Sequence, residues 1–201
     1  MFVEHLPDER GQAHTLEAFA AALLLVAGLI FATQATAVTP LSASTSNQHV
    51  ENQAEIAAQD VLTTTAARGD LKLAILYYDD GFVGADNGDH YTGLMNETHP
   101  LHDSLAEAFD RRQIAFDIDV YHPDPTAAGA TDRTRMVDMG TPTDNAAVAS
   151  TRVALYGDDR FGADDEYTLA ENGSAEYFAA PIGGSDTLYT VVEVRITAWQ
   201  M

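Results

Sequence analysis

Clusters of acidic residues are the first groups in this sequence that could do chemistry, because Ca²⁺ and Mg²⁺ prefer carboxylate oxygens as ligands. None of the clusters has the spacing of a known calcium-binding loop. The chain contains 31 acidic residues, so a solvated surface explains these clusters better than a cation site. We therefore predict no bound metal at any of them: Asp79-Asp80, Asp86-Asn87-Gly88-Asp89, and Asp158-Asp159 with Asp164-Asp165-Glu166.

Histidines are the other candidate metal ligands. His99 and His102 have an i, i+3 spacing, and His90 precedes them. However, Pro100 lies between the pair, the chain has no cysteine, and no glutamate is spaced as in a metalloprotease helix. We predict no zinc site.

Motifs for nucleophilic catalysis or phosphate binding are also missing. Gly183-Gly184-Ser185 is more simply a hairpin turn than a serine nucleophile motif. Gly81, Gly84 and Gly88 lack the strand-to-helix setting and the lysine of a phosphate-binding loop. We therefore expect no enzyme activity and no cofactor.

The charge balance excludes several classes of partner. The 201 residues carry a formal net charge of −21, and Lys72 is the only lysine. Such a surface would repel nucleic acid and anionic lipid. The acid excess resembles that of proteins from halophiles, where about 1 M salt or more screens charges within roughly 3 Å. We expect a halophilic archaeon as the source, and with no cysteine the fold relies on hydrophobic packing.

An apolar run near the N-terminus predicts a membrane-spanning helix. Every residue from Ala18 to Ala32 is apolar or glycine, and a softer continuation reaches Val38. At about 1.5 Å per residue such a run crosses a hydrocarbon core of roughly 30 Å. We predict a polar leader over 1–11 and a transmembrane helix over 12–38. Glu17 stands at the leading edge of this run, where a carboxylate needs a partner.

This stretch resembles the type IV pilin-like (class III) signal. Arg10-Gly11 directly precedes Gln12, Glu17 follows, and then the apolar helix begins. The resemblance implies that a prepilin peptidase cuts between Gly11 and Gln12 on the cytoplasmic side and that the helix stays attached. It also implies that Glu17 serves assembly by pairing with the N-terminal amine of a neighbouring pilin-like subunit. Glu17 is the sixth residue after the cut, whereas pilins usually place this glutamate fifth.

Two other interpretations of the segment stay open. It could be a plain single-pass anchor without processing, or a secretory signal cut after Ala35-Thr36-Ala37. In all three cases Arg10 marks the cytoplasmic side, so that residues 39–201 lie outside the cell. The sequons at Asn96 and Asn172 fall in predicted loops and suit a glycosylated, exported domain.

Residues 39–69 are expected to form a linker and then an amphipathic helix. Pro40 and the following Ser/Thr cluster interrupt the apolar pattern and predict either a kink or a short linker. A stripe at helical spacing then runs to Gly69 through Val50, Ala54, Ala57, Val61 and Thr64 or Thr65.

Residues 70–201 predict an extracellular α+β domain. The apolar run over 71–80 fits either a final helical turn or a buried strand, and we favour the strand. We expect a long loop over 81–100 and a helix from about Thr98 to Arg112. Residues 114–122 alternate with period two and predict a half-buried strand. Further strands are expected over 134–140, 147–157 and 187–199. The last is expected to be a central core strand, although Trp199 near its end could instead be an exposed contact between subunits.

The predicted fold is thus α+β and pilin-like: a transmembrane helix continues into an amphipathic helix, which packs with one further helix on a mainly antiparallel sheet. The whole chain also resembles an uncharacterised haloarchaeal family of single-pass surface proteins, through RGQAHTLEA, LYYDDGFVGAD and VVEVRITAWQM. This resemblance implies a place at the cell surface but no activity. We expect a structural component of a pilus-like assembly; the alternative is a solitary anchored domain that binds a sugar, a protein or a cation.

Overall fold

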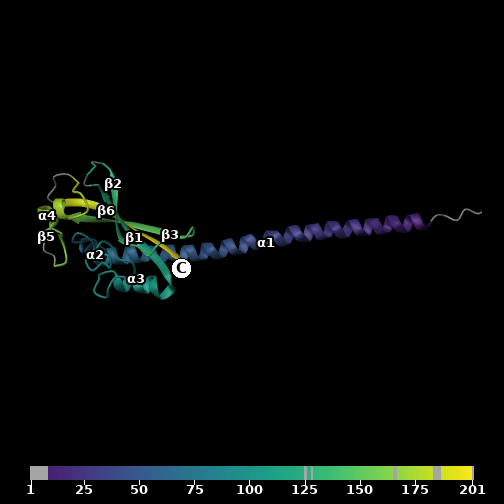
Figure 1. Ribbon diagram of the computed structural model, residues 1–201, viewed down its shortest axis with the longest axis horizontal. Coiled ribbons are helices and arrows are strands. Elements are labelled where there is room, and N and C mark those ends of the chain that lie inside the picture. The colour runs from purple at the N-terminus through teal and green to yellow at the C-terminus, as the bar shows by residue number, and fades with distance from the viewer. Residues whose placement is uncertain (1–8, 125, 128, 165–166, 183–186, 201) are drawn as a thin grey trace, which may run out of the picture. The chain divides into compact units, whose positions relative to one another are not determined.

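The computed structural model describes residues 9–124, 126–127, 129–164, 167–182 and 187–200, and the chain divides into two compact units, residues 1–48 and 49–201 (Figure 1). The fold is α+β, as the sequence predicts. The helices are α1 (Glu9–Arg68), α2 (Asp70–Leu76), α3 (His102–Ala108), the 3-10 helix η1 (Asp110–Arg112) and α4 (Leu169–Glu176). The strands are β1 (Ile114–Pro123), β2 (Thr131–Val137), β3 (Ala147–Tyr156), β4 (Arg160–Phe161), β5 (Tyr167–Thr168) and β6 (Leu188–Gln200).

Helix α1 begins in the first unit and ends in the second. The short linker expected after Pro40 does not form, because the backbone is helical from Glu9 to Arg68. A proline removes a single i→i−4 hydrogen bond, and a helix with good helix formers on both sides can continue through it. Ala35, Ala37 and Ala43 are such residues.

The part of α1 in the second unit is amphipathic, as predicted. Ala54, Ala57, Val61 and Thr65 are buried, and the neighbouring Ala58 and Leu62 widen the stripe. The hydroxyl of Thr65 donates to the carbonyl oxygen of Val61 at 2.6 Å, so this buried polar group is satisfied within the helix. Val50 belongs to the predicted stripe, but its side chain lies outside the described residues.

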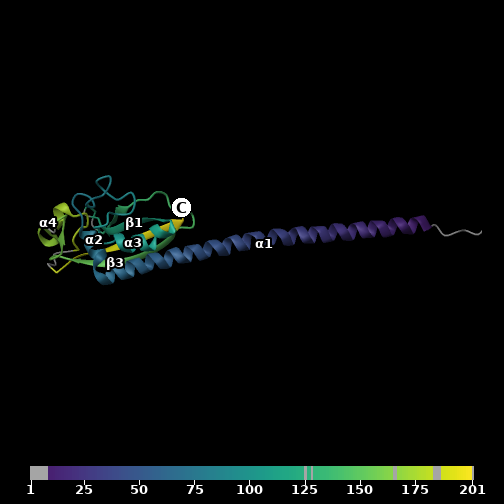
Figure 2. The same cartoon turned by 90° about the horizontal axis from the view of Figure 1, so that it is seen from below.

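The main sheet is entirely antiparallel and has the strand order β2-β1-β6-β3. Its inner face shares one hydrophobic core with α1, α2 and α3. Facing pairs such as Phe116 with Ala198 and Ile118 with Ile196 fix the register between β1 and β6. The second unit appears in two views in Figures 1 and 2.

Strand β6 is a central strand, as predicted, because it lies between β1 and β3. Val192, Val194, Ile196 and Ala198 are buried in the core. Trp199 is only 5% exposed, so the alternative of an exposed aromatic contact is wrong.

Strand β1 is buried on both faces, which corrects the expected half-buried strand. Asp117 and Asp119 point away from the hydrophobic core, yet they are 3% and 7% exposed. The reason is that β1 is also central and that arginines of β2 and the residues after β2 cover this part of the outer face.

The favoured strand over 71–80 is wrong and the helical alternative holds for its first part, because residues 70–76 form α2. Gly69 adopts a left-handed conformation (φ 86°) and separates α2 from α1. Leu71, Ala74 and Ile75 then fall at helical spacing and are buried. The long loop after α2 is as predicted, with isolated bridges at Tyr78 and Tyr91.

The predicted helix over 98–112 is shorter in the structure. It consists of α3 and the single turn η1, and Leu101, Leu105 and Phe109 bury its apolar side. The expected strands over 134–140 and 147–157 correspond to β2, which begins earlier at Thr131, and to β3.

The small sheet of β4 and β5 and helix α4 are not predicted from the sequence. A local motif starts α4: the Thr168 hydroxyl lies 2.7 Å from Glu171 Oε2, and the Glu171 N–H lies 3.4 Å from Thr168 Oγ1. The Thr-x-x-Glu sequence is that of a capping box, and the Thr168 side chain caps the Glu171 N–H.

Candidate functional site

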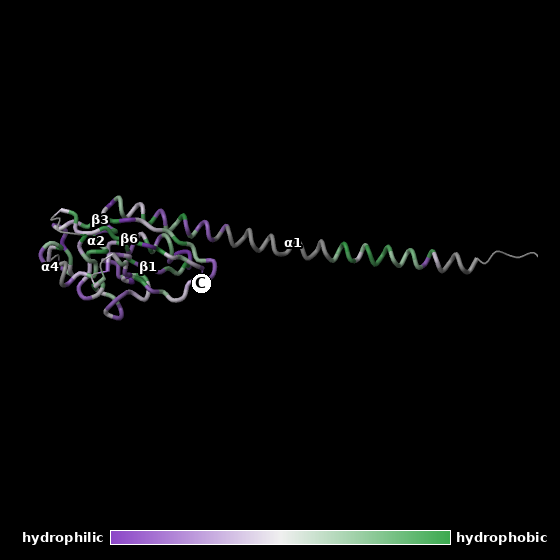
Figure 3. Tube along the Cα trace, turned by 90° about the horizontal axis from the view of Figure 1, so that it is seen from above, coloured by the Kyte–Doolittle hydropathy of each residue, from purple (hydrophilic) through white to green (hydrophobic). Residues whose placement is uncertain are grey.

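The first candidate functional region is the apolar part of α1. The helix from Thr15 to Ala32 is long and apolar enough to cross a membrane by length and composition, and none of it is buried within the described structure. Figure 3 shows this stretch as the green part of α1. Its large side chains are between 51% and 76% exposed: Leu16, Phe19, Leu23, Leu24, Leu25, Val26, Leu29, Ile30 and Phe31.

So much exposed apolar surface is costly in water. Burial is worth roughly 25 cal/mol for each Å² of apolar surface removed from water, and monomeric soluble proteins rarely expose large contiguous apolar patches. The span therefore requires a lipid or protein environment. As an N-terminal apolar helix, it is compatible with a membrane anchor and with a signal sequence.

The predicted processing and assembly residues all lie on α1. Gly11 and Gln12 fall just after the helix begins at Glu9, in the end region where helices fray. Glu17 is exposed and lies within the first turn of the apolar span. These three residues thus lie on one short helical segment at the start of α1.

The two predicted glycosylation residues differ in their settings. Asn96 is exposed in the loop between α2 and α3. Its Oδ1 accepts hydrogen bonds from the Thr98 hydroxyl at 2.7 Å and from the Thr98 N–H at 3.1 Å. Asn172 lies in helix α4 and not in the expected loop, because the capping box at Thr168 starts that helix.

The described parts of the acidic clusters do not converge on a cation site, and Asp165 and Glu166 of the third cluster lie outside the described residues. Among the described residues, no group of three or more His, Asp or Glu residues could hold a metal ion. Asp159 instead binds the ammonium of Lys72 at 2.6 Å and accepts the Tyr156 N–H at 2.7 Å. Asp86 accepts the Thr92 N–H and hydroxyl at 3.3 and 3.2 Å.

The histidines have separate structural roles. His99 is buried between the rings of Tyr77 and Tyr91, and its Nδ1 accepts the Leu101 N–H at 3.2 Å. Burial lowers the pKa of His99 to about 4, so this side chain is neutral at pH 7. His102 Nδ1 lies 2.7 Å from the carbonyl oxygen of Met95. The predicted turn at Gly183-Gly184-Ser185 lies outside the described residues.

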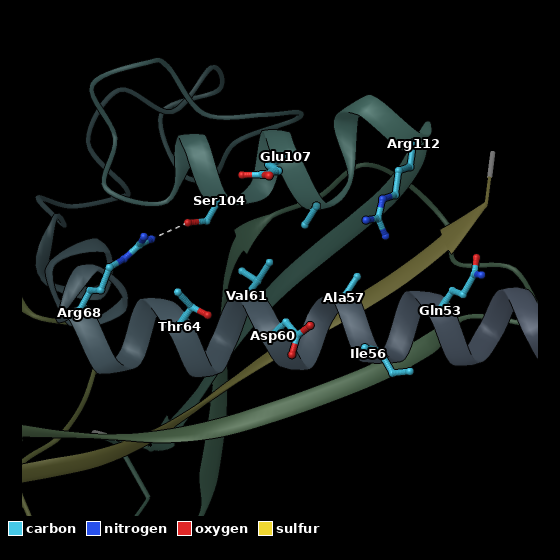
Figure 4. Close-up of a pocket in the computed structure, with 11 residues that line it drawn as sticks. Gln53, Ile56, Ala57, Asp60, Val61, Thr64, Arg68, Ser104, Glu107 and Arg112 are labelled. Carbon is cyan, nitrogen blue, oxygen red and sulfur yellow. Dashed lines mark hydrogen bonds between the residues drawn. The ribbon is translucent and has the colours of Figure 1, made fainter.

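A groove of about 670 Å³ runs between α1 and α3 (Figure 4). The Arg68 guanidinium donates to the Ser104 hydroxyl at 2.8 Å and joins the two helices. Ile56 lines the groove and is 61% exposed. The charged side chains of the groove are Asp60, Glu107, Arg68 and Arg112.

The outer face of the sheet carries a network of charges that the sequence analysis does not single out. Asp119 lies opposite Arg135 of β2 and opposite Arg195 of β6. Arg135 Nε donates to Asp119 Oδ1 at 3.2 Å, and Arg133 Nη1 lies 3.6 Å from Asp119 Oδ2. The Asp117 Oδ1 accepts the Met139 N–H at 2.9 Å, and burial raises the pKa of Asp117 above its ordinary value.

A second row of this face continues the network. Tyr121 lies opposite Arg133 on one side and Glu193 on the other, and Glu193 lies opposite Arg152 of β3. The Arg195 guanidinium stands 4.3 Å from the centre of the Tyr121 ring and donates to Glu193 Oε1 at 3.0 Å. The sequence does contain a signal for this network, because charged residues alternate at these strand positions. The signal predicts ion pairs only when the order of the strands in the sheet is known.

The chain belongs to the family of unknown function DUF7288, whose sequence model matches residues 10–198. The match includes the apolar span and the α+β domain together. No curated protein and no solved structure matches the chain.

Proposed function

We propose that this protein is a membrane-anchored subunit of a type IV pilin-like surface assembly, with residues 12–38 in the bilayer and the α+β domain outside the cell. One observation carries the proposal. Helix α1 has no break between its apolar span and the stripe of small apolar residues that packs into the core of the domain. A signal that is removed before Val38 would not need such a helix.

The family match supports retention of the helix. It begins at Arg10 and covers the span as well as the domain, so that members of the family share both parts. A retained span of this kind also supplies a surface for lateral contacts between copies, because its large apolar side chains are exposed in the single chain.

Glu17 has a specific role in this proposal. In the bilayer its carboxylate is unfavourable unless it is neutralised. If a peptidase cuts after Gly11, the new N-terminal amine of Gln12 in one copy pairs with Glu17 of the next. Each charge then neutralises the other inside the bundle of helices, and loss of either partner leaves a buried charge.

The composition supports an extracellular, high-salt setting. The acid excess keeps the domain hydrated and soluble where salt screens the repulsion between copies. The loop sequon at Asn96 is exposed to modifying enzymes on that side of the membrane.

The mass of the intact protein, purified from the membranes of its native host, tests the processing step. A chain that begins at Gln12 supports cleavage by a prepilin peptidase. A chain that begins at Met1 favours the solitary anchored domain, and one that begins at Val38 means that the domain is secreted without its helix. Either of the last two results rejects the proposed assembly signal.

Glu17→Gln tests the assembly step. We expect the variant to insert into the membrane in normal amounts but to form no filaments. Glu55→Gln is the matched control, since it makes the same chemical change at an exposed position of α1 in the second unit. Normal filaments in Glu17→Gln would reject the pairing role.

A further inference from the structure

The outer face of the main sheet concentrates the few basic residues of this acidic protein. We define the arginine face by the side chains that point outward on the four strands: Asp117, Asp119, Tyr121, Arg133, Arg135, Arg152, Glu193 and Arg195. It holds four of the nine basic residues after position 48 but only three of the 27 acidic ones. Asp138 follows β2 and is ion-paired with Arg135, which adds a fourth carboxylate beside the four arginines. This face therefore carries no net charge, whereas the remaining surface of the domain is strongly negative.

The four arginines divide into two pairs with different roles. Arg135 and Arg195 are partly buried and hold carboxylates of the face, at 3.2 Å from Asp119 and 3.0 Å from Glu193. Arg133 and Arg152 are 48% and 78% exposed, and their nearest carboxylate oxygens are 3.6 and 4.0 Å away. The first pair holds the carboxylates of the face, and the second leaves its guanidinium groups accessible at the surface.

The surroundings of these two arginines suit a protein contact. Val148, on the same side of β3 as Arg152, is 50% exposed. Arginine and tyrosine are enriched in protein interfaces, whereas lysine is depleted there. Lys72, the only lysine of the chain, lies in α2 and not on this face.

The same chain carries a complementary surface. The acidic loop, residues 79–89, exposes the side chains of Asp79, Asp80, Asp86 and Asp89. The loop is held in one conformation: the Phe82 N–H donates to the Asp89 carbonyl oxygen at 3.0 Å, and Asn87 Oδ1 accepts the Asp89 N–H at 3.0 Å. A preorganised loop loses little conformational entropy on binding.

We propose that the arginine face of one copy binds the acidic loop of a second copy. A guanidinium group can bind a carboxylate with two parallel hydrogen bonds. High salt screens long-range attraction between charges but weakens such short contacts less. The contact is heterologous, because it joins two different surfaces, and repetition of such a contact produces open chains. This inference rests on the proposed function. It adds to that assembly a contact between copies outside the bilayer.

Single cysteines test this contact directly, since the natural chain has none. Full-length Ser150→Cys and Asp89→Cys, with different affinity tags, are co-expressed in host membranes and treated with a short thiol cross-linker. Ser150 is exposed between the arginines of β3 and β6, opposite Arg195. We expect a mixed dimer of the two variants. Asp103→Cys, at an exposed position of α3, replaces Asp89→Cys in the control and should give several times less product.

A charge reversal then tests the electrostatic basis. Arg152→Glu in the Ser150→Cys chain should reduce the mixed dimer about fivefold, as expected when an exposed ion pair becomes a repulsion. Arg111→Glu makes the same change of charge at an exposed position of η1 and should leave the yield unchanged.

Three results would overturn the proposal: equal cross-linking of Asp89→Cys and Asp103→Cys, a Ser150→Cys homodimer in place of the mixed dimer, or cross-linking only to a different protein. The outcome is separable from the proposed function. A mixed dimer in Glu17→Gln membranes that lack filaments supports the contact without the assembly, whereas filaments without the mixed dimer support the assembly without this contact.

Discussion

Arg135 of β2 binds the buried carboxylate of Asp119 in the neighbouring strand, with Nε 3.2 Å from Oδ1. The same guanidinium also binds Asp138 through Nη1. A single arginine thus binds two carboxylates on the outer face of the sheet, and the side chain of one of them, Asp119, is only 9% exposed. This arrangement allows β1 to be central although two aspartates point outward from it.

Removal of this arginine should destabilise the domain more than removal of other arginines of the face. Arg135→Ala leaves Asp119 buried with only the weaker contact to Arg133, and we expect a loss of about 2–3 kcal/mol in the free energy of unfolding. Arg152→Ala should cost less than about 0.5 kcal/mol, because that side chain is 78% exposed. Denaturant titration of the full chain in detergent, at constant salt, measures both. Equal losses in the two variants would contradict the proposed role of Arg135.

His99 should make stability fall on the acid side of neutrality. Its folded pKa is about 4, below the ordinary 6.5, so between these values the unfolded chain binds a proton and the folded chain does not. Its contribution is complete above pH 6.5 and is lost as the pH falls towards 4. The loss amounts to about 3 kcal/mol, from 1.36 kcal/mol for each pKa unit.

His99→Phe tests this dependence. The variant loses the acceptor for the Leu101 N–H, so it should be less stable than the natural protein at pH 7. Between pH 6.5 and 4.5, however, its free energy of unfolding should fall by about 2–3 kcal/mol less. His49→Gln, at an exposed position of α1, controls for the loss of a histidine. Parallel pH profiles of the natural protein and His99→Phe would refute the assignment.

The elements with strong periodicity could be predicted from the sequence. Strands β1, β3 and β6 alternate apolar and polar residues over about ten positions, and the stripe from Ala54 to Thr65 repeats at helical spacing. In each case one face is buried in the same core, so local pattern and tertiary packing agree.

The elements that the sequence misses are those where local pattern is ambiguous. The apolar run from Leu71 to Leu76 is too short for periodicity to separate helix from strand. In the structure, the left-handed conformation of Gly69 and the burial of Ile75 favour the helix. Helix α4 had a readable signal in its Thr168-x-x-Glu171 capping box. The burial of Asp119 had none, because it depends on which strands lie beside β1.

The acidic loop depends on a close backbone approach at Gly81. This residue has φ 144°, and a Cβ there would lie 2.1 Å from the Gly88 carbonyl oxygen. Gly81→Ala should therefore cost roughly 3 kcal/mol or more. At Gly88 (φ 89°) a Cβ meets nothing within 4 Å. Gly88→Ala should therefore lower the free energy of unfolding by only about 1–2 kcal/mol, because the left-handed backbone conformation is unfavourable for alanine.

Gly93→Ala completes this series as the control, since a Cβ there meets nothing within 4 Å and φ is not positive. We expect a change within about 0.5 kcal/mol. Thermal unfolding of the three full-length variants should rank them Gly81, Gly88, Gly93 from the largest loss to the smallest. A Gly81→Ala protein as stable as Gly93→Ala would mean that the loop has another conformation.

Only the first of the two sequons should carry a glycan. Asn96 is exposed in a loop, and the Thr98 hydroxyl donates to its Oδ1 at 2.7 Å and not to its amide nitrogen. Asn172 is part of helix α4. A modifying enzyme would have to unwind α4 to bind the sequon at Asn172. Peptide mass spectrometry of protein from native membranes should find sugar on Asn96. Thr98→Ala should abolish this modification and Ser174→Ala should not. Sugar on Asn172 alone would show that α4 is open when the chain is modified, and unmodified Asn96 would remove one argument for an extracellular domain.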